Sequence, residues 1–340
     1  MLRPLKIAHL SARCSSTFVS RMRYANRLKV DDEALAAALE NGHMLLFHRL
    51  CPLLQRGPRG SFRAATLITS DVQSILERLG SDRTLMKESI LLGCSEQNQA
   101  QFCLDVGELH QAAVEEECGG RFISLKKAFF LLTGPEAPLV AKGQALLRWH
   151  QTNSFCSATG EPTQRNPAGS QRVCNSSGRV YYPTMSPVVI VLVSDGSRCL
   201  LGRQASFPPG MYSALAGFCE MGETLEETLS REVAEEVGLE VLEVSYSSSQ
   251  HWPFPHSSFM MGFHASVSPA HTQVSVDHTE LEDARWFSAE EITSALKAPP
   301  TRGNPAPGFW LPPKHAIANR LIAEWSQRAR PCDHVTPRTT

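Results

Sequence analysis

Apolar residues recur with two different periods along this chain. The six residues at 188–193 are all apolar, which predicts a buried β-strand. The Asp-Gly pair at 195–196 then predicts a hairpin turn that leads into a returning strand at 199–203. Between residues 223 and 237 apolar side chains repeat every fourth position, which predicts an amphipathic helix. Gly238 follows as its expected C-cap.

The residues before this hairpin show a mixed pattern without recognisable chemistry. Helices are expected to begin at Asp31, near Lys126 and near Pro138, with short apolar runs between them. The stretch from 151 to 183 is polar and rich in Gly, Pro, Asn and Ser, so apolar burial alone cannot hold it together. We therefore expect an α+β protein. Its predicted parts are an N-terminal α+β domain at 31–150, a polar linker at 151–183, a second domain at 184–328 and a flexible tail at 329–340.

Arginine and serine dominate the first thirty residues, and no acidic residue precedes Asp31. This composition is typical of a mitochondrial transit peptide, so we expect a mitochondrial protein with a transit peptide at 1–30. A disordered basic tail is the alternative. In both cases the segment is left out of the predicted fold.

Bulk composition argues against several classes of partner. Lys and Arg number 33 against 34 Asp and Glu, and a net charge of −1 gives no global attraction to nucleic acid or to an anionic membrane. The apolar stretches are far shorter than the roughly 20 residues that span a bilayer, which predicts a soluble protein without a membrane partner. Ten cysteines without any CxxC pair indicate free thiols in a reducing compartment.

Three glutamates share one face of the predicted helix. Glu232, Glu235 and Glu236 stand at i, i+3 and i+4, so their carboxylates repel one another unless a cation lies between them. Mg²⁺ and Mn²⁺ prefer carboxylate oxygens and bridge to substrate phosphates. This spacing alone does not distinguish a metal site from a solvated acidic helix face.

The residues around this helix follow a longer pattern. Gly217 precedes Glu223 by six positions, and the Arg-Glu-Val, Glu-Glu and Gly-Leu groups that follow stand at fixed distances. Residues 217–239 therefore resemble the Nudix box, and the chain resembles the Nudix hydrolases. The resemblance implies a mixed β-sheet between α-helices, with Gly217, Glu223 and Gly238 supporting the box. The metal ligands that it implies are the Ala216 carbonyl, Glu232, Glu235, Glu236 and Glu280.

The reaction implied by this resemblance is the attack of water on a diphosphate phosphorus. Bound Mg²⁺ or Mn²⁺ would neutralise charge on the phosphate oxygens and lower the pKa of the attacking water. Glu235 or Glu280 would accept the proton. Arg231 would orient the glutamates through an ion pair.

Residues 249–257 read SQHWPFPHS. By itself this run could form a stiff surface loop or a plug in the core. It resembles the SQPWPFPxS signature of the NADH-pyrophosphatase branch of the Nudix family, with His251 where that branch has proline. Trp252 and Phe254 offer apolar surface for stacking on rings. The substrate-binding residues that the resemblance implies are Tyr182, Phe218, Gln250, Trp252, Phe254, Ser257 and Ala318.

The polar linker keeps only half of another feature of this branch, a zinc ribbon of the form CxxC…CxxC. Cys156 and Cys174 remain, but Thr159 and Ser177 stand where their partners would be. Two thiolates cannot complete a tetrahedral zinc site. We therefore expect a degenerate ribbon without structural zinc, held by packing against its neighbours. The resemblance also allows a homodimer.

Three functions remain open from the sequence. The leading hypothesis is hydrolysis of NADH and NADPH, ahead of NAD⁺, to nicotinamide mononucleotide plus AMP or 2′,5′-ADP. The second keeps the catalyst but removes the NAD cap of RNA, although no basic stripe supports a long RNA contact. The third is a catalytically silent dinucleotide-binding protein, which the complete set of glutamates opposes.

Overall fold

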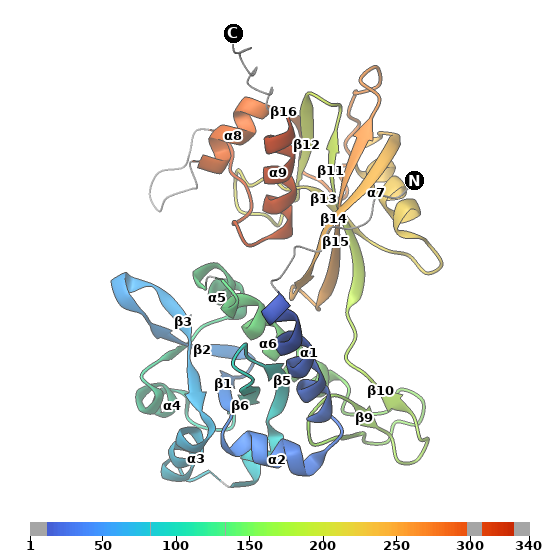
Figure 1. Ribbon diagram of the computed structural model, residues 1–340. Helices are drawn as coiled ribbons and strands as arrows, with labels where there is room; N and C mark the ends of the chain where they lie inside the picture. Colours follow the sequence, from blue (N-terminus) through green and yellow to red (C-terminus); the bar gives the residue numbers. More distant parts are fainter. Residues whose placement is uncertain (1–11, 82, 133, 298–307, 330–340) are drawn as a thin grey trace. The chain divides into compact units, whose positions relative to one another are not determined.

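The chain folds into two compact units, and the boundary between them in the sequence lies between Thr184 and Met185 (Figure 1). The computed structural model describes residues 12–81, 83–132, 134–297 and 308–329. Within these ranges no helix combines the length and the apolar character that a membrane span requires.

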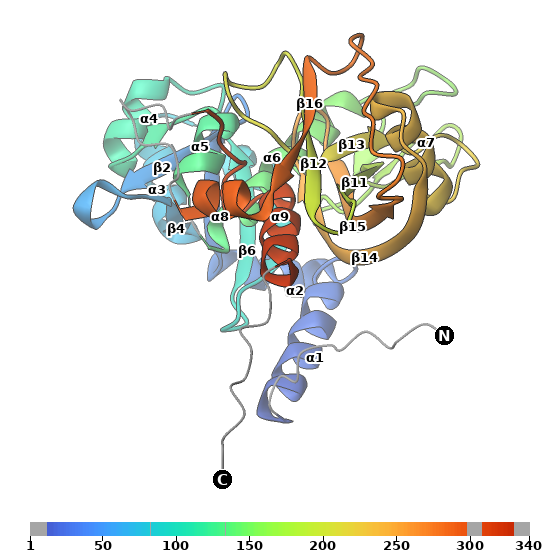
Figure 2. The same cartoon turned by 90° about the horizontal axis from the view of Figure 1, so that it is seen from above.

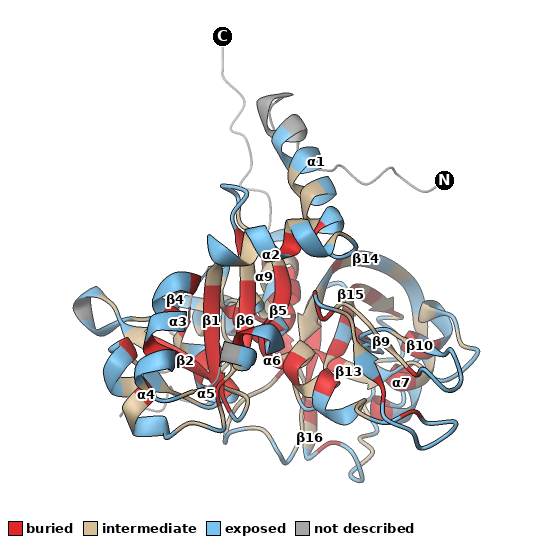
Figure 3. Cartoon of the chain, turned by 90° about the horizontal axis from the view of Figure 1, so that it is seen from below, coloured by how far each residue is buried: buried red, intermediate tan, exposed pale blue. Residues whose placement is uncertain are grey.

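A seven-stranded sheet forms the centre of the first unit. Its main order is β3-β2-β1-β6-β5, while β4 pairs with β1 and β7 with β2. Only β1 and β6 pair in parallel, and Figure 3 shows that β1, β6 and β5 carry much of the buried surface. The strands are β1 (His43–His48), β2 (Cys51–Arg56), β3 (Phe62–Ala64), β4 (Thr66–Ile68), β5 (Ile90–Cys94), β6 (Ala100–Asp105) and β7 (Arg121–Phe122).

Helices surround this sheet, and three of them were expected from the sequence. The helix predicted at Asp31 is α2, in which the Asp31 carboxylate accepts the Ala34 N–H as an N-cap. Those predicted near Lys126 and Pro138 are α5 and α6. The helices are α1 (Ala12–Arg27), α2 (Asp32–Glu40), α3 (Thr69–Arg78), α4 (Gln111–Cys118), α5 (Leu125–Leu131) and α6 (Glu136–Thr152), with 3₁₀ turns at Pro58–Gly60 and Arg83–Glu88.

The N-terminal segment that was left out of the predicted fold reaches into this core. Leu28 is fully buried, at 0% exposure, in one cluster with Met44 and Phe102. Tyr24 packs against the same cluster from α1. The transit peptide at 1–30 stays a prediction, but the end of this segment packs with the first unit, because charge and serine content do not register a single buried leucine. Residues 1–11 lie outside the described part of the chain.

The polar linker forms a small three-stranded antiparallel sheet of order β10-β9-β8. Its strands are β8 (Gln164–Arg165), β9 (Arg172–Val173) and β10 (Val180–Tyr181). Arg165 donates to the backbone carbonyls of Lys87, Glu88 and Ser89. These bonds attach the linker to the rest of the first unit, as expected for a segment with little apolar core of its own.

The second unit is a mixed sheet between helices, as predicted (Figures 1 and 2). The order is β14-β15-β11-β12-β16 with β13 on β11, and β11 pairs with β15 in parallel. Alternate residues of β11 face opposite layers: Val189 and Val191 pack in the cluster with α7, and Ile190 packs in the cluster with α9. The elements are β11 (Ser186–Ser194), β12 (Arg198–Arg203), β13 (Leu215–Phe218), α7 (Leu225–Val237), β14 (Val241–Trp252), β15 (Ser258–Val267), β16 (Asp283–Ser288), α8 (Ala289–Lys297) and α9 (Ile317–Arg328).

The predicted hairpin and acidic helix are both present in this unit. Helix α7 begins at Leu225 rather than at residue 223, because Thr224 forms a capping box with Glu227 and so places Glu223 outside the helix. Gly238 ends the helix with a φ of 69°, which confirms the predicted C-cap. Helix α9 ends at Arg328, and the predicted tail lies outside the described residues from 330 on.

Candidate active site

Three carboxylates converge beside α7. Glu232 and Glu236 come from the helix, and Glu280 comes from the segment that precedes β16. One oxygen of each lies within 4.8 Å of the others. The preceding segment is bonded to the end of α7, since the Asp277 N–H donates to the Glu236 carbonyl at 3.0 Å. This backbone contact brings Glu280 to the two helical glutamates.

Gly217 is required by the position of Glu232. A Cβ atom at residue 217 would lie 1.8 Å from Cδ of Glu232 and 2.0 Å from each carboxylate oxygen. The carboxylate therefore lies directly against the backbone of β13, next to Ala216. No side chain larger than hydrogen fits at residue 217 unless this glutamate moves.

Arg231 is paired with Glu232, but among the described residues the buried carboxylate of Glu236 is left without full compensation of its charge. Burial raises the pKa of Glu236 to about 8, and the nearby charges of Glu232 and Glu280 add to the effect. The buried Oε2 of Glu236 has no hydrogen-bond partner among the described residues. Burial also raises the pKa of Glu232, although Arg231 acts against this. A divalent cation would supply the missing positive charge, so the residues fit such an ion.

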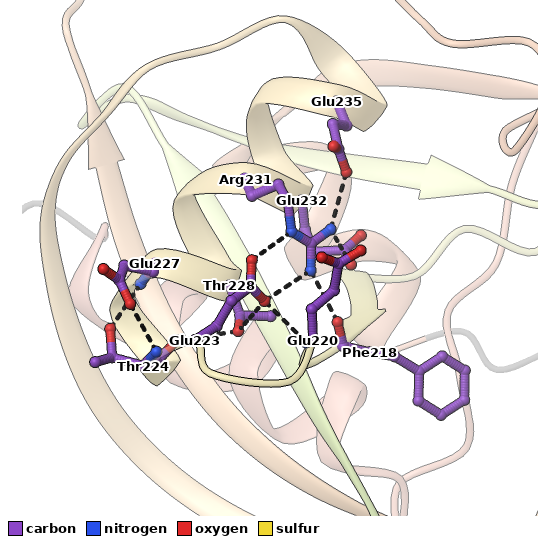
Figure 4. Close-up of polar contacts among 9 residues, drawn as sticks. All are labelled: Phe218, Glu220, Glu223, Thr224, Glu227, Thr228, Arg231, Glu232 and Glu235. Atoms are coloured by element: carbon purple, nitrogen blue, oxygen red, sulfur yellow. Dashed lines mark hydrogen bonds and ion pairs between the residues drawn. The ribbon is translucent and has the colours of Figure 1, made fainter.

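Arg231 connects the helix to the loop and the strand beneath it (Figure 4). Its guanidinium donates to Glu223 at 2.7 and 3.0 Å, to Glu232 at 2.9 Å and to the Phe218 carbonyl at 2.9 Å. Hydrogen bonds from Arg231 and from the Glu220 N–H lower the pKa of Glu223 to about 2. Glu223 thus remains ionised and anchors the guanidinium.

Glu235 lies outside the carboxylate cluster, although the sequence places it on the same helix face. Its carboxylate accepts from Arg231 at 2.9 Å, and 56% of its side chain is exposed. Glu232 and Glu236 are buried, whereas Glu235 is displaced around the helix toward solvent. Figure 4 shows Glu235 beside the guanidinium of Arg231. The structure therefore brings two of the three predicted helical ligands together with Glu280.

The predicted substrate residues of the second unit gather at one end of its sheet. Four residues are paired in one row across β13, β11, β15 and β14: Phe218, Val188, Met260 and Gln250. Phe218 is 58% exposed. Beyond Gln250, the rings of Trp252 and Phe254 meet edge to face at 5.6 Å.

Gln250 is bonded within the protein. Its amide nitrogen donates to the His315 carbonyl at 2.7 Å, and its amide oxygen accepts the Ile317 N–H at 2.8 Å. These bonds hold the start of α9, where Ala318 is 5% exposed. The structure therefore gives Gln250 a positioning role that the sequence did not indicate.

His251 and Ser257 form a pair that the signature did not predict. Nε2 of His251 lies 2.7 Å from Oγ of Ser257, which closes the turn that carries Phe254. Ser257 has a positive φ of 71°, which is unusual for a residue other than glycine. Tyr182 lies in the first unit and is 61% exposed.

Sequence reasoning also missed Glu324 of α9. Its carboxylate accepts from Arg320 at 2.9 Å, from Ser247 at 2.7 Å and from His264 at 3.1 Å. Burial acts to raise its pKa, but these hydrogen bonds outweigh burial and lower the pKa to about 2. Glu324 and Gln250 thus attach α9 to the sheet at two points. Nothing in the sequence distinguishes this glutamate from others on exposed helices.

The ribbon cysteines lie among hydroxyl groups. Sγ of Cys156 lies 3.0 Å from the Tyr181 hydroxyl and 3.6 Å from Ser177 Oγ, and Sγ of Cys174 lies 3.6 Å from Thr159 Oγ1. Hydrogen bonds from Thr159 and Tyr181 lower the pKa of the Cys156 thiol to about 5. The charge of this thiolate is thus compensated within the protein.

His150, next to the ribbon, is bonded at both ring nitrogens. Nε2 donates to the Gly169 carbonyl at 2.8 Å, so Nδ1 accepts from Arg172 at 3.2 Å. Burial lowers its pKa to about 4, and the imidazole is neutral. Arg172 also donates to Thr163 Oγ1 at 2.6 Å and to its carbonyl at 2.8 Å. These bonds brace the ribbon.

Three family models match consecutive parts of the chain. They are an NADH pyrophosphatase-like rudimentary NUDIX domain at residues 41–149, an NADH pyrophosphatase zinc ribbon domain at 151–182 and a NUDIX domain at 184–309.

Curated relatives match most of this chain. The chain is 49% identical over 328 residues to the mitochondrial NAD(P)H pyrophosphatase NUDT13 of Homo sapiens, which covers 93% of both chains. The protein of the same name from Mus musculus is also 49% identical, over 92% of both chains. The NAD-capped RNA hydrolase NUDT12 of Homo sapiens is 43% identical over 209 residues, or 58% of this chain and 43% of the relative.

Proposed function

Because the chain belongs to the Nudix hydrolase family, in its NADH-pyrophosphatase branch, we propose that it is a mitochondrial NAD(P)H pyrophosphatase. It hydrolyses the diphosphate bond of NADH and NADPH, which yields nicotinamide mononucleotide with AMP or 2′,5′-ADP. Near-complete coverage of the NUDT13 relatives supports this assignment. One structural observation carries the reaction class: the cluster of Glu232, Glu236 and Glu280 contains a buried carboxylate oxygen without a partner among the described residues.

Nudix hydrolases use divalent metal ions, and we assign Mg²⁺ or Mn²⁺ to this cluster. Glu232, Glu236 and Glu280 would hold the ion, with the Ala216 carbonyl as a further ligand on the adjoining strand. When bound, it would neutralise charge on the diphosphate oxygens and lower the pKa of the attacking water. Hard oxygen ligands favour these ions over zinc.

The chain's own residues then divide the remaining tasks. Arg231 fixes the loop after β13 to the helix, so that Glu232 stays against Gly217. Either Glu235, at the solvent side of Arg231, or Glu280, within the cluster, accepts the proton of the attacking water. Phe218, Trp252 and Phe254 supply apolar surface for the rings of the dinucleotide. Gln250 keeps the start of α9 in place beside them.

The test compares turnover of NADH, NADPH and NAD⁺ by the full chain with Mg²⁺ or Mn²⁺. Products are separated by chromatography and identified by mass, with Glu235→Gln and Glu280→Gln beside the wild type. Mononucleotide products that disappear in either variant support the assignment. Loss of turnover in Glu235→Gln alone identifies Glu235 as the proton acceptor, because Glu280 is also a metal ligand. A folded, metal-loaded protein that binds these dinucleotides without cleaving them would overturn it in favour of a silent binding protein.

The same site supports a second substrate, the NAD cap of RNA. The observation that favours it is the 43% identity to a relative named NAD-capped RNA hydrolase. Turnover of an NAD-capped oligonucleotide at rising salt would measure the contribution of RNA phosphates, because each neutralised phosphate steepens the salt dependence. Equal rates for the capped oligonucleotide and free NAD⁺ at all salt concentrations exclude an RNA contact.

We propose that the ribbon holds no structural zinc, although its family is a zinc ribbon. Thr159 and Ser177 occupy the positions of two thiolates, and the bonds of Arg165, Arg172 and His150 brace the segment. We also propose a homodimer, because the family resemblance allows one. Light scattering on the purified protein measures the mass, and a monomer at micromolar concentration would contradict the proposed dimer.

A further inference from the structure

The ribbon contains two turns of matching backbone geometry. In each turn the cysteine N–H donates to the carbonyl of the residue five positions later, at 2.7 Å for Cys156 and 2.9 Å for Cys174. The glycines four positions after each cysteine have positive φ, 72° at Gly160 and 70° at Gly178. Their N–H groups donate back to the cysteine carbonyls at 2.9 and 2.8 Å. Both cysteines are therefore presented in the same way.

Each sulfur lies against the hydroxyl of the opposite turn. Cys156 Sγ is 3.6 Å from Ser177 Oγ, and Cys174 Sγ is 3.6 Å from Thr159 Oγ1. Each hydroxyl also helps to lower the pKa of the thiol of its own turn, Thr159 that of Cys156 and Ser177 that of Cys174. Both hydroxyls thus lie between the sulfurs, so the two thiols point toward a common centre.

These thiols are buried only beneath exposed surface turns. Cys156 is 2% exposed and Cys174 is 0% exposed, but the residues at 157–160 and 175–179 are all exposed. Cys103 and Cys199 differ, because they are buried within β6 and β12 of the large sheets, where burial raises the pKa of the thiol. A small motion of the surface turns would admit a small oxidant to the ribbon pair but not to these two cysteines.

We propose that Cys156 and Cys174 are a redox-sensitive dithiol, which a hydroperoxide converts into a disulfide that joins the two turns. The Cys156 thiolate attacks a peroxide oxygen and releases hydroxide, which leaves a sulfenic acid. The Cys174 thiolate then attacks the Cys156 sulfur and displaces the second hydroxide. With hydrogen peroxide, two thiols give one disulfide and two waters, and two electrons pass from sulfur to the peroxide.

The bond would replace, with one covalent link, the cross-link that four thiolates and a zinc ion make in a complete ribbon. It would close the loop between residues 156 and 174, which restricts the unfolded chain and so stabilises the ribbon. Reduction would return the hydrogen-bonded form. The ribbon would therefore be more stable against unfolding under oxidising conditions.

The experiment oxidises the full-length enzyme with stoichiometric hydrogen peroxide, blocks free thiols with iodoacetamide and isolates the native fraction by gel filtration. Trypsin separates the two cysteines, because Arg148, Arg165, Arg172 and Arg179 flank them. We expect peptides 149–165 and 173–179 to appear as one species, two hydrogens lighter than their sum, which dithiothreitol separates. The oxidised protein should also melt at a higher temperature than the reduced protein.

Two variants control for general oxidation. Cys156→Ser should abolish the linked species, whereas Cys94→Ser, at a half-buried thiol of β5, should leave it unchanged. If Cys156→Ser does not fold, peptide mapping of the wild type decides alone. Oxidation spread equally over Cys51, Cys94 and Cys219 without the linked pair would overturn the proposal. One equivalent of zinc bound to thiols that resist peroxide would also overturn it.

Discussion

The carboxylate cluster of α7 and the thiol pair of the ribbon are both sets of acidic side chains gathered at one point, but their charges are treated differently. At α7, Glu236 carries a buried oxygen without a partner among the described residues, and its pKa rises to about 8. In the ribbon, hydroxyl donors surround Cys156 and its pKa falls to about 5. We therefore expect an ion at the carboxylate cluster, where negative charge is left uncompensated, and none in the ribbon, where hydrogen-bond donors already stabilise the thiolate. On this expectation, the compensation of charge around the ligands decides metal occupancy together with the identity of the ligands.

The largest expected effect is that of Glu236→Gln, which removes the uncompensated charge. We expect turnover of NADH with Mg²⁺ to fall roughly 10³-fold, because the ion and its water lose a ligand. Steady-state kinetics measures this effect, with Glu226→Gln on the exposed side of the same helix as the matched control. Full activity of Glu236→Gln would show that the charge of Glu236 is not needed to hold an ion, and the contrast with the thiol pair would be lost.

Gly217→Ala should have the next largest effect. The new Cβ cannot coexist with Glu232 in its present position, since it would lie 1.8 Å from Cδ. We expect turnover to fall by about 10²-fold while far-ultraviolet circular dichroism stays unchanged, because the site is displaced but the strand remains. Ser230→Ala, at an exposed position of α7, serves as control. Wild-type kinetics in Gly217→Ala would show that Glu232 does not need its place against β13.

The two clusters should also differ in how pH acts on stability. The pKa of Glu236 is higher in the folded protein, about 8, than the ordinary value of 4.5, so the folded state binds more protons. Its contribution to stability is therefore greatest at low pH and is lost as pH rises through about 8. In the metal-free protein we expect the free energy of unfolding to fall by on the order of a few kcal/mol between pH 6 and pH 9.

Urea unfolding in a chelator at each pH measures this loss. Mg²⁺ should reduce the slope, because the ion binds the ionised form of the folded state. Glu236→Gln should reduce it in the absence of metal. If neither Mg²⁺ nor the Glu236→Gln substitution changes the slope of stability against pH, the pH dependence belongs to other groups.

The smallest effect on turnover is expected from completing the ribbon site. The double variant Thr159→Cys with Ser177→Cys restores four thiols, so it should bind about one zinc per chain, whereas the wild type should bind almost none. Metal analysis after dialysis measures the difference, and NADH turnover should change less than about twofold, because these residues are not among those assigned to the reaction. A wild type that retains zinc would show that hydroxyl donors do not substitute for the ion.

Local patterns in the sequence were sufficient for much of the second unit. The apolar run at 188–193 and the four-residue repeat in α7 depend on short-range periodicity, so β11 and α7 could be predicted. Gly238 could be placed as a cap because only a residue that tolerates positive φ ends a helix in this way. Fixed spacing likewise identified the family from the box at 217–239. The nature of the chemistry therefore followed from the sequence alone.

Other features depended on contacts between distant residues. Helical spacing placed three glutamates on one face, but only packing against β13 decided that Glu232 and Glu236 turn inward while Glu235 pairs with Arg231. Glu280 joins them through a backbone bond at the end of α7, which no local pattern encodes. The burial of Leu28 was equally invisible from composition.

The roles of Gln250 and of the ribbon hydroxyls were also decided by tertiary structure. The Gln250 amide forms hydrogen bonds with the backbone at the start of α9, more than sixty residues later in the sequence. The two turns of the ribbon compensate each other's sulfurs across a gap that the sequence shows only as a missing pair of cysteines. A sequence specifies which groups are available and at what local spacing. Which of them meet, and whether their charges are compensated, depends on how the elements pack.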